Sequence, residues 1–460
     1  MNKYSFFKTV GVVSLIAFLS CRKTEVLPQP EPFLDISTKE VTFTPEAGTQ
    51  VISIDSHQEF TALSSSSWCT VSPSKGHLKI SVIVNQTAGE KRTADIAVHC
   101  GDLTDKIVVT QFGDEASVLV KETDIIINTL RPDYTFTLDI TANVPVIFAL
   151  PKWIVEKNDN EPVIGRKTYS FQATTLPVEL EQRIENLVVK YADVNLAVIP
   201  VKQTSQNCAM SVGTYNILID LPSWDEYRGT LVNNLIRQYD FDIIGMQEVR
   251  RSFLEDITLR DRIYAFTGKG GSDGIAAGEH APIVYKKDRL KLLNSGTFWL
   301  SDTPDVPSVG WDARWVRTCS WGRFMDKISG LEFYIFSAHV EAVDIASIES
   351  SKLLLSKIKS IAGNNTPAFL VGDFNSRSLG ESISILLNDG LLKDSYDLSE
   401  TEKVGSEGTY NDFLTKPSTT RIDYIFVTEG IRVKEYKVLN DRPGGQFPSD
   451  HDPVLIVAEF

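Results

Sequence analysis

The segment Leu370-Val371-Gly372-Asp373-Phe374-Asn375 sets the architecture that the sequence predicts for the C-terminal half of the chain. The apolar run from Ala368 to Val371 predicts a buried strand, which a glycine, a carboxylate and a carboxamide then follow. Side chains two residues apart on an extended chain point the same way, so Asp373 and Asn375 are expected to project together from the strand end. Such a pair is typical of a metal or phosphoester site, and the alternative is an Asx-type turn that caps the strand.

Length and charge set the first bounds on the function. The chain has 460 residues, of which 42% are hydrophobic and 10% aromatic, and its formal charge is −14. This length predicts about three domains, and the composition is typical of a folded globular protein. Affinity for nucleic acid comes largely from Lys and Arg, so the acidic balance argues against DNA or RNA as the substrate.

The N-terminus has the pattern of an export signal. Lys3 and Lys8 precede an apolar run that is too short to span a bilayer. Leu19-Ser20-Cys21 is similar to a bacterial lipobox, in which Cys21 becomes the lipidated N-terminus, and the alternative is a plain secretory signal with an incidental cysteine. We therefore expect a signal peptide over residues 1–20, a proline-rich tether over 21–32, and an exported protein whose lipid anchor holds it on the periplasmic or cell-surface face of the outer membrane.

The remaining cysteines give no metal-binding pattern. Their spacings match no zinc template, and the residues are Cys69, Cys100, Cys208 and Cys319. Cys69 and Cys100 either form a disulfide within one small domain or remain buried free thiols.

Two β-sandwiches are predicted before the C-terminal domain, over residues 33–113 and 114–206. Both segments consist of short alternating runs separated by turn residues, which is typical of antiparallel immunoglobulin-like sandwiches. Each has a tryptophan in its middle and a glutamine at the end of its last strand, Trp68 and Gln111 in the first and Trp153 and Gln203 in the second. The segments resemble BACON domains, the first more closely. That resemblance implies glycan or mucin binding, and the alternative is a pair of spacers with both tryptophans in their cores.

From residue 207 onward the pattern changes to strands mixed with helices. Apolar runs predict strands at 209–218, 241–247, 282–285 and 331–336, and helical spacing predicts helices at 228–239 and 346–362. Polar residues stand at the ends of these strands, namely Asn216, Glu248, His339, Asp373, Asn375, Asp423, Asp450 and His451. In this order they resemble the endonuclease/exonuclease/phosphatase superfamily, which implies an α/β four-layer DNase I-like sandwich over residues 207–460. The fold class expected for the chain is therefore multidomain, with two all-β sandwiches ahead of this domain.

The resemblance also implies a metal site. It makes Glu248 the principal ligand of Mg²⁺, or of Mn²⁺ or Ca²⁺, with Asn216 and Asp450 as further ligands. A hard cation of this kind prefers oxygen ligands and keeps several of its waters. Some relatives carry an acid where this chain has Leu218, so the alternatives of one metal and two metals both stay open.

The same resemblance implies roles for the other strand-end residues. His451 pairs with Asp423, and His339 with Glu279, because a carboxylate fixes the tautomer of an imidazole. Asp373 orients or deprotonates the attacking water, and Asn375 donates a hydrogen bond to a phosphoryl oxygen.

Two further features lie between these motifs. Arg317 is a candidate phosphate clamp, and the alternative is a structural ion pair. Four tryptophans crowd the same region, and at least one is a candidate for stacking on a sugar or lipid head group, although most are expected in the core: Trp299, Trp311, Trp315 and Trp321.

The sequence thus predicts an exported, lipid-anchored, metal-dependent phosphoesterase. Its expected substrate is a small phosphorylated compound, such as a sugar phosphate, an inositol phosphate or a phospholipid head group. The alternatives are an extracytoplasmic nuclease and a glycan-binding surface protein with an inactive C-terminal domain. The intact pair Asp450-His451 argues against inactivity, and no feature of the sequence indicates an oligomeric state.

Overall fold

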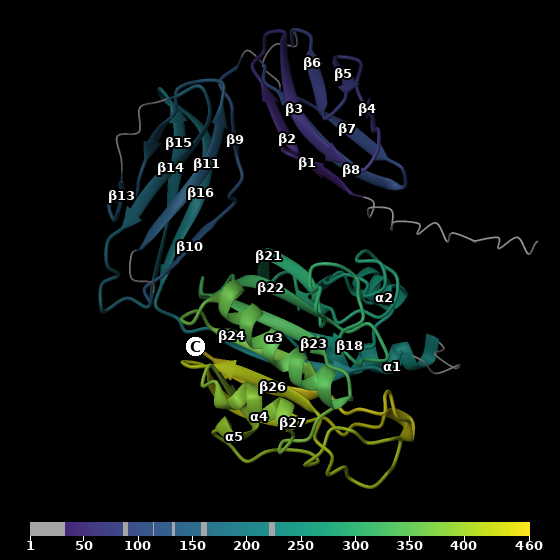
Figure 1. Cartoon of the computed structure of the whole chain (residues 1–460). Coiled ribbons are helices and arrows are strands. Elements are labelled where there is room, and N and C mark those ends of the chain that lie inside the picture. The colour runs from purple at the N-terminus through teal and green to yellow at the C-terminus, as the bar shows by residue number, and fades with distance from the viewer. Residues whose placement is uncertain (1–32, 86–90, 114, 131–133, 158–162, 220–225) are drawn as a thin grey trace, which may run out of the picture. The chain divides into compact units, whose positions relative to one another are not determined.

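The computed structural model describes residues 33–85, 91–113, 115–130, 134–157, 163–219 and 226–460, with only the backbone described at 226–227 and 258–261 (Figure 1). The predicted signal peptide, tether and Cys21 lie outside these residues. The chain forms two compact units, one with the first sandwich and one with most of the second sandwich and the C-terminal domain. Within the described part, none of the helices has the length and apolar character needed to cross a bilayer.

The first sandwich is made of two four-stranded sheets, with the strand orders β1-β3-β6-β5 and β2-β8-β7-β4. Its strands are β1 Leu34–Ile36, β2 Glu40–Phe43, β3 Gly48–Ser56, β4 Thr61–Ser64, β5 Cys69–Ser74, β6 His77–Val82, β7 Arg92–Cys100 and β8 Leu103–Gln111. Alternate side chains of β7 are buried, as expected when one face of a sheet covers a core. Cys69 and Cys100 are both buried free thiols, which settles the alternative between a disulfide and free cysteines.

The second sandwich repeats this plan, with the strand orders β10-β16-β15-β12 and β13-β14-β11-β9. Its strands are β9 Val118–Val120, β10 Ile125–Asn128, β11 Thr135–Ala142, β12 Ile147–Ala149, β13 Ile154–Glu156, β14 Gly165–Ala173, β15 Gln182–Tyr191 and β16 Val194–Thr204.

Among the strand pairs that the structure describes, each sandwich contains a parallel pair, and there the antiparallel pattern expected from the sequence does not hold. The parallel pairs are β2 with β8 and β10 with β16. Parallel neighbours need a long crossover connection, and here the strands that lie between the two partners in the sequence supply it. The period-two alternation of apolar residues is the same in both kinds of pairing, so the sequence pattern could not distinguish them.

Both sandwiches contain the same contact between a tryptophan, an arginine and the terminal glutamine, which we call the Trp–Arg–Gln clamp. The guanidinium of Arg92 lies 4.4 Å from the centroid of the Trp68 ring, and its Nε donates to Gln111 Oε1 at 3.0 Å. Arg183 repeats this at 4.4 Å from Trp153, with Nε donating to Gln203 Oε1 at 2.7 Å. One face of each indole is therefore covered by a cation, which supports a role for both rings in packing.

Replacing Arg183 with alanine should lower the free energy of unfolding of the second sandwich by about 1–3 kcal/mol. The change removes a charged donor from the fully buried Gln203 and uncovers the Trp153 ring. Hydrogen exchange of the β15 and β16 amides would report the loss. Arg166→Ala is the matched control, because its ion pair with Asp139 is exposed and worth less than about 1 kcal/mol. Equal protection in both variants would show that the clamp does not stabilise the sandwich.

The C-terminal domain consists of two six-stranded sheets, which we call sheet A (β19-β20-β18-β17-β28-β27) and sheet B (β21-β22-β23-β24-β26-β25). The strands of sheet A are β17 Ala209–Asn216, β18 Ile243–Gln247, β19 Tyr264–Thr267, β20 Ile283–Lys286, β27 Arg432–Val438 and β28 Val454–Glu459. The strands of sheet B are β21 Leu290–Trp299, β22 Thr318–Asp326, β23 Glu332–His339, β24 Ala368–Asp373, β25 Leu392–Asp394 and β26 Asp423–Thr428. The helices are α1 Glu226–Gln238, α2 Arg251–Asp261, α3 Asp344–Ala362, α4 Glu381–Asn388 and α5 Ser395–Leu398, with a short 3-10 turn at Pro443–Gly445.

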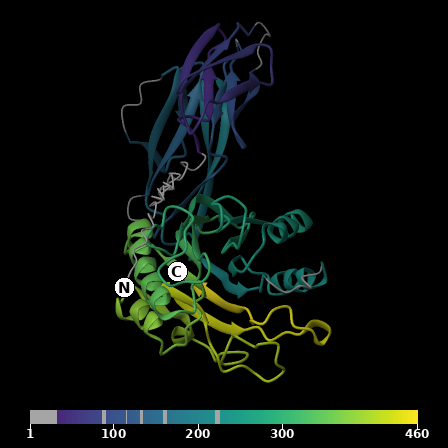
Figure 2. The ribbon, with the colours of Figure 1, turned by 45° about the vertical axis from the view of Figure 1, so that its right-hand side comes forward.

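These elements form the predicted four layers. One apolar core lies between the sheets and joins residues such as Val212 and Ile243 of sheet A to Ile335 and Val371 of sheet B. A second core joins α3 and α4 to sheet B, and a third joins α1 and α2 to sheet A. Figure 2 shows the green helices on one side of the sheets and the teal helices on the other. The order is thus helix, sheet, sheet, helix.

Glycines allow the closest approaches in this domain. A Cβ atom on Gly245 of β18 would lie 2.3 Å from Val371 Cγ2 of sheet B, so the two sheets are in direct contact there. A Cβ atom on Gly372 would lie 2.0 Å from the carbonyl oxygen of Ala338 on the neighbouring strand. The glycine before Asp373 is therefore required by packing.

Candidate active site

The polar residues at the strand ends meet because the central strand pairs are parallel. In sheet A, β17 and β18 run parallel with Asn216 opposite Gln247, so Asn216 and Glu248 leave the same edge of the sheet. In sheet B, β23 and β24 run parallel with His339 opposite Asp373. The antiparallel strand β26 begins at Asp423, which lies opposite Asp373. Each sheet thus supplies a separate part of the site.

Asp373 Oδ2 is the atom on which the site converges. Asn216 Nδ2 donates to this oxygen at 2.9 Å, and the Nε2 atoms of His339 and His451 lie 3.6 and 3.8 Å from it. Its other oxygen, Oδ1, accepts the backbone N–H of Asn375 at 2.8 Å. Asn375 Nδ2 donates to Val340 O at 3.0 Å and lies 3.2 Å from His339 Nε2. The carboxylate is 1% exposed, so its contacts with these groups take place away from bulk water.

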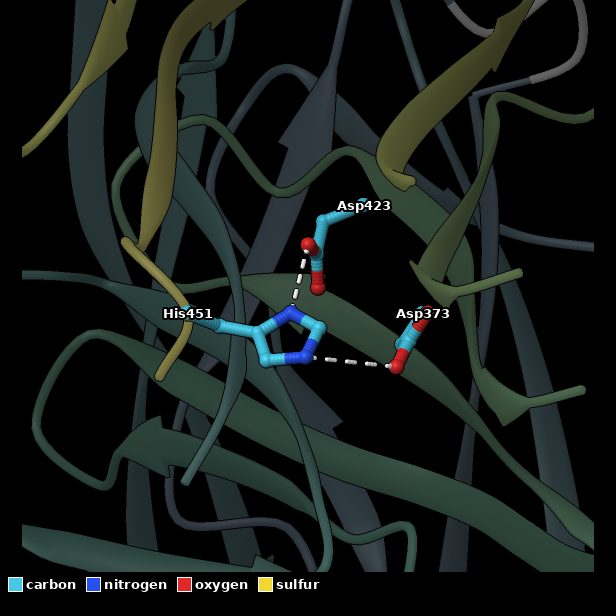
Figure 3. A group of neighbouring side chains, drawn as sticks. All are labelled: Asp373, Asp423 and His451. Atoms are coloured by element: carbon cyan, nitrogen blue, oxygen red, sulfur yellow. Dashed lines mark hydrogen bonds and ion pairs between the residues drawn. The ribbon is translucent and has the colours of Figure 1, made fainter. Parts of the chain in front are cut away.

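Two imidazoles each contact a carboxylate through Nδ1, and their Nε2 atoms both face Asp373. His451 Nδ1 lies 2.8 Å from Asp423 Oδ2, and His339 Nδ1 lies 2.5 Å from Glu279 Oε1. Figure 3 shows the imidazole of His451 between the Asp423 and Asp373 carboxylates. These are the two pairings that the family resemblance implies.

The charged groups in this cluster shift one another's pKa values. Burial alone would lower the pKa of His451, but the carboxylates of Asp423 and Asp373 outweigh it and raise this pKa to about 10. Burial likewise opposes the charged form of His339, yet Glu279 raises the pKa of its imidazole. Burial and the nearby Asp423 carboxylate raise the pKa of Asp373. The cluster therefore favours protonated imidazoles around a carboxylate that retains affinity for a proton.

A second group of oxygens adjoins Asp373. Glu248 Oε1 accepts from Asn216 Nδ2 at 3.0 Å, and Glu248 Oε2 accepts from the backbone N–H of Ile219 at 2.9 Å. Burial raises the pKa of Asp450, and the negative charge of Glu248 raises it further. An isolated antiparallel bridge between Val249 and His280 brings the preceding residues, Glu248 and Glu279, to the same part of the domain.

Two sets of residues are candidates for holding a cation. Asp373, Asp423 and His451 offer ligand atoms within 4.8 Å of one another. However, His451 Nδ1 already engages Asp423, and a protonated imidazole has no lone pair to give. In the predicted set, Glu248 and Asp450 offer carboxylate oxygens, which hard divalent cations prefer, whereas Asn216 directs its Nδ2 toward Glu248 and Asp373 and accepts the backbone N–H of Leu218 with its Oδ1. Its carboxylates repel each other, and positive charge would relieve that repulsion, so this set fits a divalent metal better.

Arg317 lies in an ion-pair network. Its Nη1 lies 3.1 Å from Glu279 Oε2, and its Nε lies 3.5 Å from Glu341 Oε2. These contacts match the structural ion pair that the sequence left open as the alternative to a phosphate clamp. Arg317 also lines the cleft described next, so the side chain faces the site while it holds Glu279.

An open cleft reaches this cluster at Glu248 and Glu279. Its volume is about 640 Å³, and Trp315 and Arg317 also line it. A cleft of this size is near the middle of the range for sites that hold a small ligand. The site is therefore accessible from the side on which Glu248 and Glu279 lie.

Some residues of the site were missed in the sequence. Glu341, 4% exposed, lies two residues after His339, and this spacing, the same as that of Asp373 and Asn375, is a signal that could have found it. Tyr410 packs its ring edge against His451 at 5.1 Å between centroids, and no pattern around it points to the site. His280, in contrast, is a fully buried histidine whose Nδ1 faces Gly278 O, outside the cluster around Asp373.

Changing Asp423 to asparagine should move the alkaline limb of the pH–activity profile to lower pH. The carboxylate is the strongest of the groups that raise the pKa of His451, and a neutral amide removes that stabilisation of the imidazolium. The protonated fraction at pH 8–9 would then fall, as an NMR titration of the imidazole in metal-free protein would show. Asp412→Asn is the matched control, since it removes an equal charge next to Tyr410. An unmoved limb would contradict a catalytic role for the charged imidazole.

The geometry agrees with comparisons to known proteins. Residues 213–451, more than half of the chain, match the model of the Endonuclease/Exonuclease/phosphatase family. The chain belongs to this family. Residues 58–112 match the BACON family, described as a proposed N-terminal binding domain, and the first sandwich is a BACON domain.

Solved structures of family members resemble the C-terminal domain. A family protein from Bacteroides thetaiotaomicron is 36% identical, with a TM-score of 0.52, over 55% of this chain and 99% of its own. A mannosyl-6-phosphatase from the same species is also 36% identical, with a TM-score of 0.52, over 55% of this chain and 100% of its own. An uncharacterised protein of Acanthamoeba polyphaga mimivirus is 28% identical over 260 residues, which are 51% of this chain and 92% of that protein.

Membership in the endonuclease/exonuclease/phosphatase family confirms the predicted DNase I-like fold and makes the C-terminal domain a member of a hydrolase family. Enzymes of this family generally use divalent metal ions, in agreement with the oxygen-rich site. The individual role of each site residue stays a prediction, and the experiments below address it.

Proposed function

We propose that the chain is a Mg²⁺-dependent phosphoester hydrolase that acts on a small phosphorylated substrate. The observation that carries this proposal is the convergence of two imidazoles, each paired with a carboxylate, on Asp373 Oδ2, beside the Glu248 carboxylate and the amide group of Asn216. A phosphoester is hydrolysed when charge on the phosphoryl oxygens is neutralised and a water is positioned for attack. The site brings two protonated imidazoles and a buried carboxylate that can act as a base within a few ångströms of one another.

In this proposal Glu248, Asn216 and Asp450 hold the cation. A bound Mg²⁺ would supply Lewis-acid stabilisation of the phosphoryl oxygens. Each oxygen ligand is already positioned by its own contacts, Glu248 through Ile219 N and Asp450 through Ser449 Oγ at 3.2 Å. Fixed ligands lose little freedom when the ion binds.

The residues around Asp373 carry out the proton chemistry. Asp373 accepts a hydrogen bond from the attacking water and takes its proton, which the raised pKa of this carboxylate favours. His451, held by Asp423 and charged near neutral pH, places its Nε2–H toward the transferring phosphoryl group. His339 and Asn375 add a second imidazole and an amide donor on the other side of Asp373.

A small substrate is favoured over nucleic acid. The formal charge of −14 disfavours a polyanion, and the 36% identical mannosyl-6-phosphatase indicates that a closely similar domain acts on a phosphorylated sugar. Export and a lipid anchor at Cys21 complete the proposal. Labelling with a radioactive fatty acid would test the anchor, because Cys21→Ser should abolish incorporation.

A panel of substrates tests the activity. The full-length mature protein would be assayed with sugar phosphates, inositol phosphates, phospholipid head groups, a bis-ester and plasmid DNA, in Mg²⁺ and in EDTA. We expect turnover of small monoesters that EDTA abolishes. No metal-dependent turnover of any substrate would refute the enzyme, and rapid cleavage of plasmid DNA with no turnover of small esters would identify a nuclease.

A further inference from the structure

Trp315 is an exposed aromatic residue in the cleft that leads to the site. Of the tryptophans that the structure describes, it alone is exposed, with 64% of its surface accessible, whereas Trp153 and Trp299 are 6% and 3% exposed. It lines the cleft together with Glu248 and Glu279. A single exposed apolar side chain is common on protein surfaces, so exposure alone does not indicate a function.

The backbone that carries Trp315 is tied to the catalytic cluster. The buried carboxylate of Glu341 accepts the backbone N–H of Arg314 at 3.3 Å, and the backbone N–H of Trp315 also stabilises its charge. The same carboxylate lies 3.5 Å from Arg317 Nε, and Arg317 in turn contacts Glu279, the partner of His339. The segment on both sides of Trp315 is thus fixed relative to the imidazole of His339, while the indole itself remains exposed. An exposed aromatic ring on a fixed backbone loses less freedom when it binds a ligand than one on a mobile segment.

The rest of the cleft lining determines which ligand fits. Ser252 and Ser272 supply hydroxyl groups, and the side chain of Arg251, whose guanidinium lies 5.0 Å from the centroid of the Phe266 ring, supplies a cation. A pyranose ring presents one face of C–H groups and an edge of hydroxyl groups, so it matches a flat indole surrounded by polar side chains. An acyl chain would instead require a continuous apolar surface.

We propose that Trp315 stacks against the sugar ring of the substrate and makes the enzyme selective for phosphorylated monosaccharide units. This inference rests on the proposed function, because it places the phosphate of the same substrate at Asp373. Trp315 is a specificity residue here, and the hydrolytic step itself does not depend on its ring.

The first test compares substrates with and without a ring. Mannose 6-phosphate and glycerol 3-phosphate would be assayed with the wild type, Trp315→Ala and Trp315→Phe. We expect Trp315→Ala to lower kcat/KM for the sugar phosphate about tenfold, chiefly through KM, because an aromatic stacking contact is worth about that factor. Glycerol 3-phosphate should change less than about twofold, and phenylalanine should restore part of the loss. Phe413→Ala is the control, since Phe413 is 38% exposed and does not line the cleft.

The second test measures binding without turnover. Calorimetry of mannose 6-phosphate would compare His451→Ala with the double variant His451→Ala/Trp315→Ala in Mg²⁺, and we expect the Kd to rise about tenfold in the double variant. Unchanged Kd values, or an equal loss for both substrates in the first test, would overturn the role of Trp315. If the wild type hydrolyses no ester, the proposed function fails, and this binding comparison still decides the inference. A mannobiose that carries the phosphate on its terminal unit would show whether Trp315 stacks against a free sugar phosphate or against the phosphorylated end of a glycan.

Discussion

Replacing His451 with alanine should lower kcat for a small phosphate ester by about 10²–10³-fold, the range typical of losing one donor that stabilises charge in the transition state. The imidazole is 5% exposed and is fixed by Asp423, so its Nε2–H has one direction in which to act. Because the group acts on the transition state, the loss should appear in kcat more than in KM. Steady-state kinetics at pH 7 with saturating Mg²⁺ would measure it.

A buried imidazole also contributes to packing, so a second variant separates the two effects. His451→Gln fills part of the space and keeps a donor, but it cannot carry the positive charge. We expect it to be nearly as inactive as His451→Ala while its near-UV circular dichroism and Tm stay close to those of the wild type. A folded His451→Gln protein with kcat within tenfold of the wild type would show that the charged imidazole is not catalytic.

The second large effect should come from Glu248→Gln. This change removes a charged oxygen ligand and weakens Mg²⁺ binding by about a hundredfold or more, since even residues that only support ligands cost 10–100-fold. Activity at limiting Mg²⁺ should fall by a similar factor, and EDTA should abolish activity in the wild type.

A readout other than activity comes from thermal unfolding. A metal that binds the folded state raises Tm by mass action, so Mg²⁺ should raise the Tm of the wild type and leave Glu248→Gln nearly unchanged. Glu349→Gln is the matched control, because Glu349 is a surface residue of α3 paired with Lys352 and should keep the Mg²⁺-dependent shift. If Glu248→Gln retained the full shift, the metal would lie elsewhere, and Asp373 with Asp423 would be the next residues to change.

Two strand ends of the C-terminal domain could be predicted from the sequence because each belongs to a largely apolar run. Every residue of β24 is buried, and its run ends at Asp373, so the polar residue necessarily marks the sheet edge. The same holds for β18, whose five residues are all buried before Glu248. The meeting of these ends depends on parallel pairing, which the family resemblance supplied and which apolar periodicity alone does not give.

Other features depend on contacts between distant parts of the chain, which a single sequence does not contain. The pairing of Arg92 with Trp68 and Gln111 joins strands β7 and β8 to the turn before β5, and nothing in the spacing of these residues predicts it. The exposure of Trp315 among several tryptophans of similar surroundings was equally undetermined. Glu341 positions the backbone next to Trp315 and forms one of the two ion pairs of Arg317.

Because both sheets contribute to one site, partial unfolding should affect catalysis before it affects the strands. The hydrogen bond from Asn216 to Asp373 crosses from sheet A to sheet B, and the pair of His451 with Asp423 joins the segment before β28 to sheet B. A small slip of one sheet over the other would separate these atoms while every strand kept its own hydrogen bonds. In urea, catalysis should therefore disappear before far-UV circular dichroism changes. Activity would then report the alignment of the two sheets more sensitively than the secondary structure does.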